Sequence, residues 1–173
     1  FETISAVDQH AALPHYRITR NSNLPFQKNS IYLVDSGAQY LDGTTDITRT
    51  VILGSPTKEQ KDRFTRVLKG HIAIATCNFI EGTKGSSLDP LARKYLQEIG
   101  CDYDHGTGHG IGSFLNVHEG PQRIAKNQGL SDSEIKEGMI LSNEPGYYKK
   151  NKYGIRTENL IITKRKSQTL LNF

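Results

Sequence analysis

The sequence predicts an α+β fold whose sheet is rich in antiparallel strands. Strand-like segments fill the first part of the chain, two amphipathic helices occupy the middle, and short strands with glycine-rich turns return after residue 101. This order argues against repeated βαβ units, which would alternate strands and helices along the whole chain.

Two strands are expected to form an antiparallel hairpin near the N-terminus. The first lies within residues 30–40, where Ile31–Val34 is a β-prone apolar run that ends before Gly37. The second covers Asp46–Leu53. The connection, Leu-Asp-Gly-Thr at residues 41–44, contains the Asp-Gly pair that is typical of a tight turn.

Two helices are expected in the middle of the chain. The first begins at Ser55-Pro56, with serine as the cap and proline at the first helical position. The second begins near Ser87, tolerates Pro90 in its first turn and ends at Gly100. Apolar residues spaced three and four apart give each helix a buried face. They are Phe64, Val67, Leu68, Ile72 and Ala75 in the first helix, and Leu88, Leu91, Ala92, Tyr95, Leu96 and Ile99 in the second. A long loop is expected at residues 120–136.

Composition excludes several classes of protein. Apolar residues make up 35% and charged residues 23%, which is a globular balance and not that of a disordered chain. The net charge of +4 is scattered, so a nucleic-acid-binding surface is not expected. No run of 18 apolar residues exists to span a membrane. Cys77 and Cys101 do not form a CxxC pattern, which favours the reducing cytoplasm.

Two aspartates flank the turn of the predicted hairpin. Asp35 ends the first strand and Asp46 begins the second, eleven residues later, so both carboxylates can lie on one side of the sheet. Adjacent carboxylates repel each other unless cations separate them. Aspartates that merely cap a turn are the structural alternative.

A glycine-rich run at residues 105–112 carries His105 and His109, and His118 follows nine residues after the second. Four glycines in eight residues oppose a helix, and no glutamate follows the first histidine, so this is not the helical zincin motif. Glycines let the backbone approach a ligand closely and direct imidazoles from a turn or a bent strand.

Two glutamates complete the set of candidate ligands. Glu144 follows the apolar run Met139–Leu141, and Glu158 lies in a predicted strand on the same face as Arg156. A buried glutamate is costly unless it is paired, and an ion pair with Arg156 would by itself explain Glu158. Together, four carboxylates and one imidazole form an oxygen-rich set that suits two divalent ions, with manganese, cobalt or zinc as candidates. The set is Asp35, Asp46, His109, Glu144 and Glu158.

These motifs resemble the pita-bread metallopeptidases, a family that includes methionine aminopeptidase, prolidase and aminopeptidase P. The resemblance rests on residues 34–50, 105–112, 142–148 and 154–159 and extends over nearly the whole chain. The stretches Asp-Ser-Gly-Ala-Gln-Tyr, Ser-Phe-Leu-Asn-Val-His-Glu-Gly and Glu-Pro-Gly-Tyr-Tyr are most similar to the aminopeptidase P (Xaa-Pro aminopeptidase) subgroup. The resemblance implies the pita-bread fold, a curved antiparallel-rich sheet flanked by helices.

The resemblance implies a role for each metal ligand. Asp35 would chelate one ion, Asp46 and Glu158 would bridge both, and His109 and Glu144 would hold the other. Glu144 would also act as the general base toward a hydroxide that bridges the ions, and would pass the proton to the leaving proline nitrogen.

Four further residues would surround the ligands. His118 is similar to a family histidine that contacts the scissile carbonyl, and His105 to one that lines the proline pocket. His15 is similar to a histidine on the substrate side. Arg156 would orient the Glu158 carboxylate.

The implied activity is hydrolysis of the bond between an N-terminal residue and a following proline. Manganese is the expected metal, with zinc or cobalt as alternatives, and the full-length protein would be a homodimer. Residues 1–173 would form a partial C-terminal catalytic domain, truncated at both ends and without the upstream non-catalytic domains. The alternatives are a prolidase-type dipeptidase, a non-catalytic pita-bread binding module and metal-free, creatinase-like hydrolysis. The complete ligand set argues against the last two.

Overall fold

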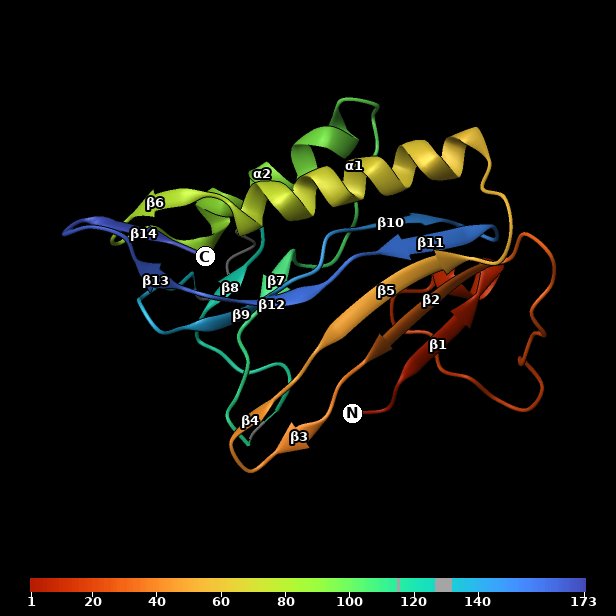
Figure 1. Ribbon diagram of the computed structural model, residues 1–173, viewed down its shortest axis with the longest axis horizontal. Coiled ribbons are helices and arrows are strands. Elements are labelled where there is room, and N and C mark those ends of the chain that lie inside the picture. Colours follow the sequence, from red (N-terminus) through yellow and green to blue (C-terminus); the bar gives the residue numbers. More distant parts are fainter. Residues whose placement is uncertain (115, 127–131) are drawn as a thin grey trace.

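The computed structural model describes residues 1–114, 116–126 and 132–173 and has the predicted mixture of helices and antiparallel strands (Figure 1). Within those residues, every pair of named strands is antiparallel. Residues 127–131 of the expected long loop, and Leu115 of the motif that ends at Gly120, lie outside the described residues. In the described part of the chain, no helix combines the length and the apolar character that crossing a bilayer requires.

The elements, in chain order, are β1 (Ile4–Val7), the 3-10 helix η1 (Asp8–Ala12), β2 (Ile31–Ser36), β3 (Gln39–Tyr40), β4 (Gly43–Thr44), β5 (Ile47–Ile52), α1 (Lys58–Ala75), β6 (Asn78–Ile80), α2 (Gly85–Gln97), β7 (Gly108–His109), β8 (Arg123–Ile124), β9 (Ile140–Asn143), β10 (Gly146–Lys149), β11 (Tyr153–Arg156), β12 (Asn159–Ile162), β13 (Lys164–Arg165) and β14 (Leu170–Asn172).

The predicted N-terminal hairpin is confirmed. Strands β2 and β5 pair along their full length, β1 pairs with the other edge of β2, and the short β3–β4 pair lies within the connection. Side chains alternate between the two faces of a strand, so Ile31, Leu33 and Asp35 share one face of β2, and all three are buried. The alternation that buries two apolar residues therefore also carries the Asp35 carboxylate into the interior.

Two isolated bridges connect the separate strand groups into one run. The bridge Thr48↔Glu158 joins β5 to the start of β12, and Gly110↔Leu141 joins the end of β7 to β9. With the regular pairs, the order of neighbours becomes β1-β2-β5-β12-β9-β7-β8. Segments from both ends of the chain thus meet in the middle of the sheet.

The first helix begins later than predicted. Thr57 is the N-cap of α1: its side chain accepts a hydrogen bond from the backbone N–H of Gln60, whose side chain accepts one from Thr57 in return. This capping box satisfies two N–H groups that a cap at Ser55 would leave without partners, so the predicted start was wrong.

The buried face of α1 is also rotated from the prediction. Val67, Gly70, His71 and Ile74 are buried, whereas Ile72 is 49% exposed. The reason is Gly70, where an added Cβ would lie 2.2 Å from the carbonyl oxygen of Ala92 in α2. The two helices approach each other through this glycine, which turns the polar His71 inward.

The second helix, in contrast to the first, starts earlier than predicted. Helix α2 begins at Gly85, with Lys84 as its N-cap, and Pro90 lies inside it. Gly100 has a φ of +68° and ends this segment as expected. Leu88, Ala92 and Leu96 are buried as predicted, whereas Leu91 is 38% exposed.

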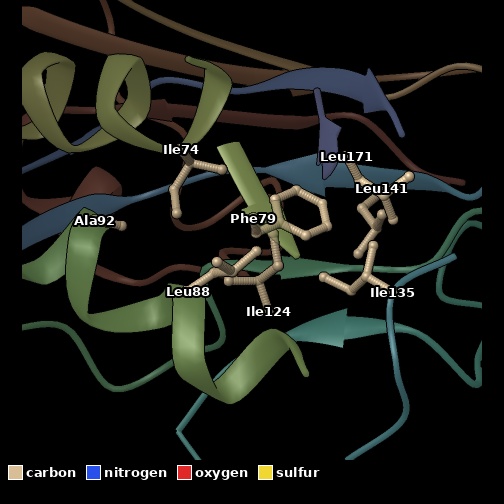
Figure 2. Packing of buried hydrophobic residues seen from close by; sticks show 8 residues of the cluster. All are labelled: Ile74, Phe79, Leu88, Ala92, Ile124, Ile135, Leu141 and Leu171. Atoms are coloured by element: carbon tan, nitrogen blue, oxygen red, sulfur yellow. The ribbon is translucent and has the colours of Figure 1, made fainter. Parts of the chain in front are cut away.

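The main hydrophobic core lies between the helices and the strands. Figure 2 shows side chains from α1, β6, α2, β8, β9 and β14 that point toward one another around Phe79. Helix α1 lies along one side of the strands in Figure 1 and contributes Ile74, which is fully buried. The cluster comprises Ile74, Phe79, Leu88, Ala92, Ile124, Ile135, Leu141 and Leu171.

We expect Ile74→Ala to lower the free energy of unfolding by about 2–5 kcal/mol, because it leaves a cavity in this core. Ile72→Ala, on the exposed side of the same helix, is the matched control and should cost less than about 1 kcal/mol. Urea denaturation followed by circular dichroism measures both values. Equal losses for the two variants would contradict the rotated helix face.

Candidate metal centre

A cleft of about 1120 Å³ opens on the sheet where the N-terminal and C-terminal strands meet. All nine residues to which the sequence assigned a role line this cleft. They are His15, Asp35, Asp46, His105, His109, His118, Glu144, Arg156 and Glu158.

The four carboxylates come from the ends of central strands. Asp35 lies in β2, Asp46 directly precedes β5, Glu144 directly follows β9 and Glu158 directly precedes β12. Asp35, Asp46 and Glu158 are 9%, 6% and 1% exposed, so three acidic groups are withdrawn from water at one place. The alternative of solvated aspartates that cap a turn does not fit this burial.

His109 directs one ring nitrogen at the carboxylates. Its Nδ1 lies 2.9 Å from the carbonyl oxygen of Gly110, so Nδ1 carries the proton and donates. Nε2 then presents its lone pair at 3.4 Å from Asp46 Oδ2 and 3.3 Å from Glu144 Oε1. This is the tautomer that a histidine uses as a metal ligand.

Several buried oxygens in the cleft have no hydrogen-bond partner in the described part of the chain. They are Asp35 Oδ1, Asp46 Oδ1 and Glu158 Oε1. Ligand atoms of Asp46, His109 and Glu158 all lie within 4.8 Å of one another. Buried anionic oxygens without donors are costly unless a cation satisfies them, and hard divalent ions prefer such oxygens. The residues present therefore fit a pair of divalent metal ions.

The pKa values of these groups in the metal-free protein reflect the burial of several carboxyl groups close to one another. Burial, followed by repulsion from the neighbouring carboxylates, raises the pKa of Glu158 to about 10. Burial also raises the pKa of Glu144 to about 7, although the charges of His109 and Arg156 oppose the rise. The pKa of Asp35 is raised by burial against the opposing effect of Arg156.

The structural alternative for the Glu158 segment, a direct ion pair between Arg156 and Glu158, is not formed. The Nη2 of Arg156 lies 2.7 Å from Asp35 Oδ2, so the buried ion pair involves Asp35 and not Glu158. Arg156 reaches Glu158 only through Thr48, whose hydroxyl accepts from Nε of the arginine at 3.1 Å and donates to Glu158 Oε2. Arg156 ends β11 and Glu158 lies two residues further on, and both side chains line the cleft and contact the Thr48 hydroxyl.

The three remaining histidines lie around the carboxylates. The ring of His118 packs edge-on against that of His109, with centroids 4.2 Å apart, and His15 lines the cleft. Nδ1 of His105 donates to the carbonyl oxygen of Gly106, so its Nε2 accepts from the Tyr148 hydroxyl at 2.8 Å. Burial lowers the pKa of His105 to about 4, which keeps this imidazole neutral.

A comparison with models of known protein families identifies the family of this chain. Residues 1–165 match the model of metallopeptidase family M24. The chain belongs to this family. The resemblance to pita-bread metallopeptidases that the motifs indicated is thereby confirmed.

Similar proteins and solved structures indicate which members of family M24 this chain resembles in sequence and fold. The chain is 50% identical over 173 residues to a probable Xaa-Pro aminopeptidase P of Laccaria bicolor, and covers 100% of itself but 27% of that protein. It is 52% identical over 164 residues to a probable Xaa-Pro aminopeptidase P of Fusarium vanettenii. That alignment covers 95% of the chain and 26% of the relative. The chain thus spans about a quarter of the length of these relatives.

Solved M24 structures confirm the pita-bread fold. The X-prolyl aminopeptidase of Caenorhabditis elegans, described as a cytosolic enzyme with a di-nuclear active site, matches with a TM-score of 0.95 and 48% identity over 100% of this chain and 29% of that chain. The prolidase of Pyrococcus furiosus matches with a TM-score of 0.84 and 32% identity, over 98% of this chain and 48% of that chain.

Two glycines of the histidine run allow neighbouring backbone segments to pack closely. An added Cβ at Gly108 would lie 2.0 Å from the carbonyl oxygen of Ser142, and one at Gly110 would lie 2.0 Å from that of Glu119. The close approach expected here is therefore to neighbouring backbone. It places His109 beside Ser142, whose hydroxyl accepts from the His109 N–H at 2.9 Å and donates to Glu144 Oε1 at 3.1 Å.

A buried ion pair behind the histidine run was missed. Arg93 and Asp89 of α2 are 2% and 1% exposed and pair at 2.6 Å. Arg93 also donates to the carbonyl oxygens of Tyr103 and His105, and Asp89 accepts from the Thr107 hydroxyl at 2.6 Å. The signal was an i,i+4 Asp–Arg pair on the apolar face of the helix, among Leu88, Ala92 and Leu96.

We expect Arg93→Leu to lower the free energy of unfolding by about 3–5 kcal/mol, because Asp89 would stay buried without its partner. Lys94→Leu, one residue further along α2 and exposed, is the matched control and should change it by less than about 0.5 kcal/mol. Chemical denaturation checks both variants. A loss below 1 kcal/mol for Arg93→Leu would show that this pair does not support the histidine run.

Proposed function

We propose that this chain carries the active site of a metal-dependent Xaa-Pro aminopeptidase, which releases an N-terminal residue that is followed by proline. One observation supports the proposal above all others. Buried carboxylate oxygens without hydrogen-bond donors converge with the Nε2 of His109 at one place in the cleft. Relatives that share half of the residues of this chain carry the name of that activity.

The proposed ligands are the five residues of the sequence motif. Asp35 would hold one ion, His109 and Glu144 would hold the other, and Asp46 and Glu158 would contribute to both. Two divalent ions, when bound, make a shared water nucleophilic at neutral pH and neutralise charge that develops on the substrate oxygen. Four carboxylates match the four positive charges of such a pair.

The surrounding residues have separate proposed tasks. Glu144, which Ser142 holds by one oxygen, accepts the proton of the attacking water and passes it to the proline nitrogen. His118 donates to the oxygen of the scissile carbonyl. Neutral His105, held by Tyr148, lines the pocket for the proline ring, and His15 borders the substrate side of the cleft.

Arg156 supports the ligands from behind. Its ion pair with Asp35 fixes Oδ2 of that carboxylate, while the buried Oδ1 has no donor among the described residues. The same guanidinium donates to Tyr148 at 2.9 Å, so it also helps to hold His105. We assign it a positioning role for Asp35, with an effect on Glu158 only through Thr48.

We further propose manganese as the natural metal, with zinc or cobalt as alternatives, since oxygen-rich sites accept several ions. The proposed setting is a cytoplasmic homodimer in which residues 1–173 are part of the C-terminal catalytic domain of a longer protein. Metal analysis of the full-length protein and its elution volume in size-exclusion chromatography bear on these assignments.

A prolidase-type dipeptidase is the second candidate, because the prolidase of Pyrococcus furiosus shares the fold at 32% identity. The two activities differ in whether the chain continues after proline. We expect the full-length protein with manganese to cleave Ala-Pro-Ala between alanine and proline. The peptide Ala-Ala-Ala is the control for proline specificity and should be cleaved poorly. Hydrolysis confined to the dipeptide Ala-Pro would favour the prolidase reading, as measured by chromatography of the products.

We expect Glu144→Ala to lower kcat by at least about 10²-fold and to weaken metal binding, because it removes a ligand and the proton carrier together. Glu137→Ala is the control, since Glu137 is an exposed partner of Arg165. In contrast, His118→Ala and His105→Ala should lower turnover while the metal content stays near two ions per chain. Mass spectrometry of the metal and peptide assays measure these effects. Loss of metal from either histidine variant would refute the ligand assignment.

A further inference from the structure

His71 lies behind the candidate metal centre, on the face of α1 that packs against the sheet. It is 7% exposed, and it was not among the residues that the sequence motifs indicated. A polar side chain at such a position must find partners within the protein. Two of the partners of His71 are asparagines next to the glutamates of the proposed centre.

The first partner is Asn143, and the contact runs in both directions. The imidazole Nδ1 donates to the backbone oxygen of Asn143 at 3.0 Å, and the side-chain amide of Asn143 donates to the backbone oxygen of His71 at 2.9 Å. Asn143 ends β9 and is followed by Glu144. One hydrogen bond therefore attaches the helix to the peptide group that leads into Glu144, and the other attaches it to the side chain of Asn143.

The second partner is Asn159, the first residue of β12, which follows Glu158. Its amide Nδ2 lies 3.3 Å from Nε2 of His71. Arg49 fixes the orientation of this amide, because its Nη2 donates to Asn159 Oδ1 at 2.8 Å. The same guanidinium donates through Nη1 to the backbone oxygen of Glu158 at 2.7 Å.

These contacts form a closed frame. Asn143 and Asn159 are directly opposite each other in the β9–β12 pair, and His71 joins both of them on the side away from the cleft. Glu144 directly follows Asn143 at the end of β9, and Glu158 directly precedes Asn159 at the start of β12. The separation and tilt of the two glutamate side chains thus follow from the geometry of the frame.

We propose that His71 is a positioning residue that sets the spacing of Glu144 and Glu158 and thereby the affinity for the metal pair. The inference rests on the proposed metal centre. Supporting groups that fix the direction of metal ligands affect affinity or activity by about 10–100-fold when they are removed. A neutral imidazole suits this task, and burial lowers the pKa of His71.

The test compares four substitutions in the full-length protein. His71→Phe keeps a ring of similar size and removes both hydrogen bonds of the imidazole. His71→Asn keeps a donor at the position of Nδ1. Asn159→Ala breaks the second contact without altering the helix. Val67→Ala, at another buried position of α1, is the control for a loss of stability alone.

The readouts are the melting temperature of the metal-free protein, the dissociation constants for Mn²⁺ by calorimetry well below that temperature, and kcat and KM. We expect His71→Phe to weaken binding of at least one ion by about 10–100-fold and to lower kcat more than it changes KM. His71→Asn should recover at least part of that loss, and Asn159→Ala should show a smaller loss of the same kind. Val67→Ala should lower the melting temperature and leave both dissociation constants within about twofold.

If His71→Phe resembles Val67→Ala in the metal titration, or if His71→Asn is no better than His71→Phe, the positioning role is wrong. Should His71→Phe fail to fold, unchanged metal affinity in Asn159→Ala overturns the role. Failure of the wild-type protein to bind two ions would instead contradict the proposed function, so the two failures are distinguishable.

Discussion

The mutual repulsion of carboxylates withdrawn from water is the constraint around which this fold is arranged. Asp35, Asp46 and Glu158 are almost fully buried, and Glu144 lies beside them in the same cleft. Such a group of anions destabilises the folded state unless protons, cations or hydrogen-bond donors compensate for it. The raised pKa values of Glu144 and Glu158 show that the protein alone does not compensate fully.

The compensation that the protein does supply has a common design. One oxygen of each of three carboxylates has a donor: Arg156 for Asp35, the Thr48 hydroxyl for Glu158 and the Ser142 hydroxyl for Glu144. The other oxygens of Asp35 and Glu158 have no donor among the described residues. In Asp35 and Glu158, one oxygen is thus fixed while the other stays available, which suits a site built to receive ions. The same holds for His109, whose Nδ1 is bound to Gly110 while Nε2 is presented to the cleft.

Much of this arrangement was predictable from the sequence, because local patterns fix it. The hairpin follows from two β-prone runs about an Asp-Gly turn, and the alternation in β2 buries Asp35. The start of α1 and its buried face were not predictable from apolar spacing, because a capping box and the close contact at Gly70 determine them. The Asp89–Arg93 pair had a local i,i+4 signal within α2. The partner of Arg156 and the frame around His71 depend on contacts between distant segments. A single sequence contains no direct signal for such contacts.

Those distant contacts bear on when the site can form. The hydrogen bond from Thr48 to Glu158 joins positions 110 residues apart, and the ion pair of Arg156 with Asp35 joins positions 121 residues apart. Contacts with long loops form late, because the chain loses its loop entropy before the contacts stabilise it. The carboxylates therefore come together only when the two ends of the chain have closed onto each other. A partly folded chain would hold these anions apart in solvent, and high affinity for the metal pair would mark the completion of folding.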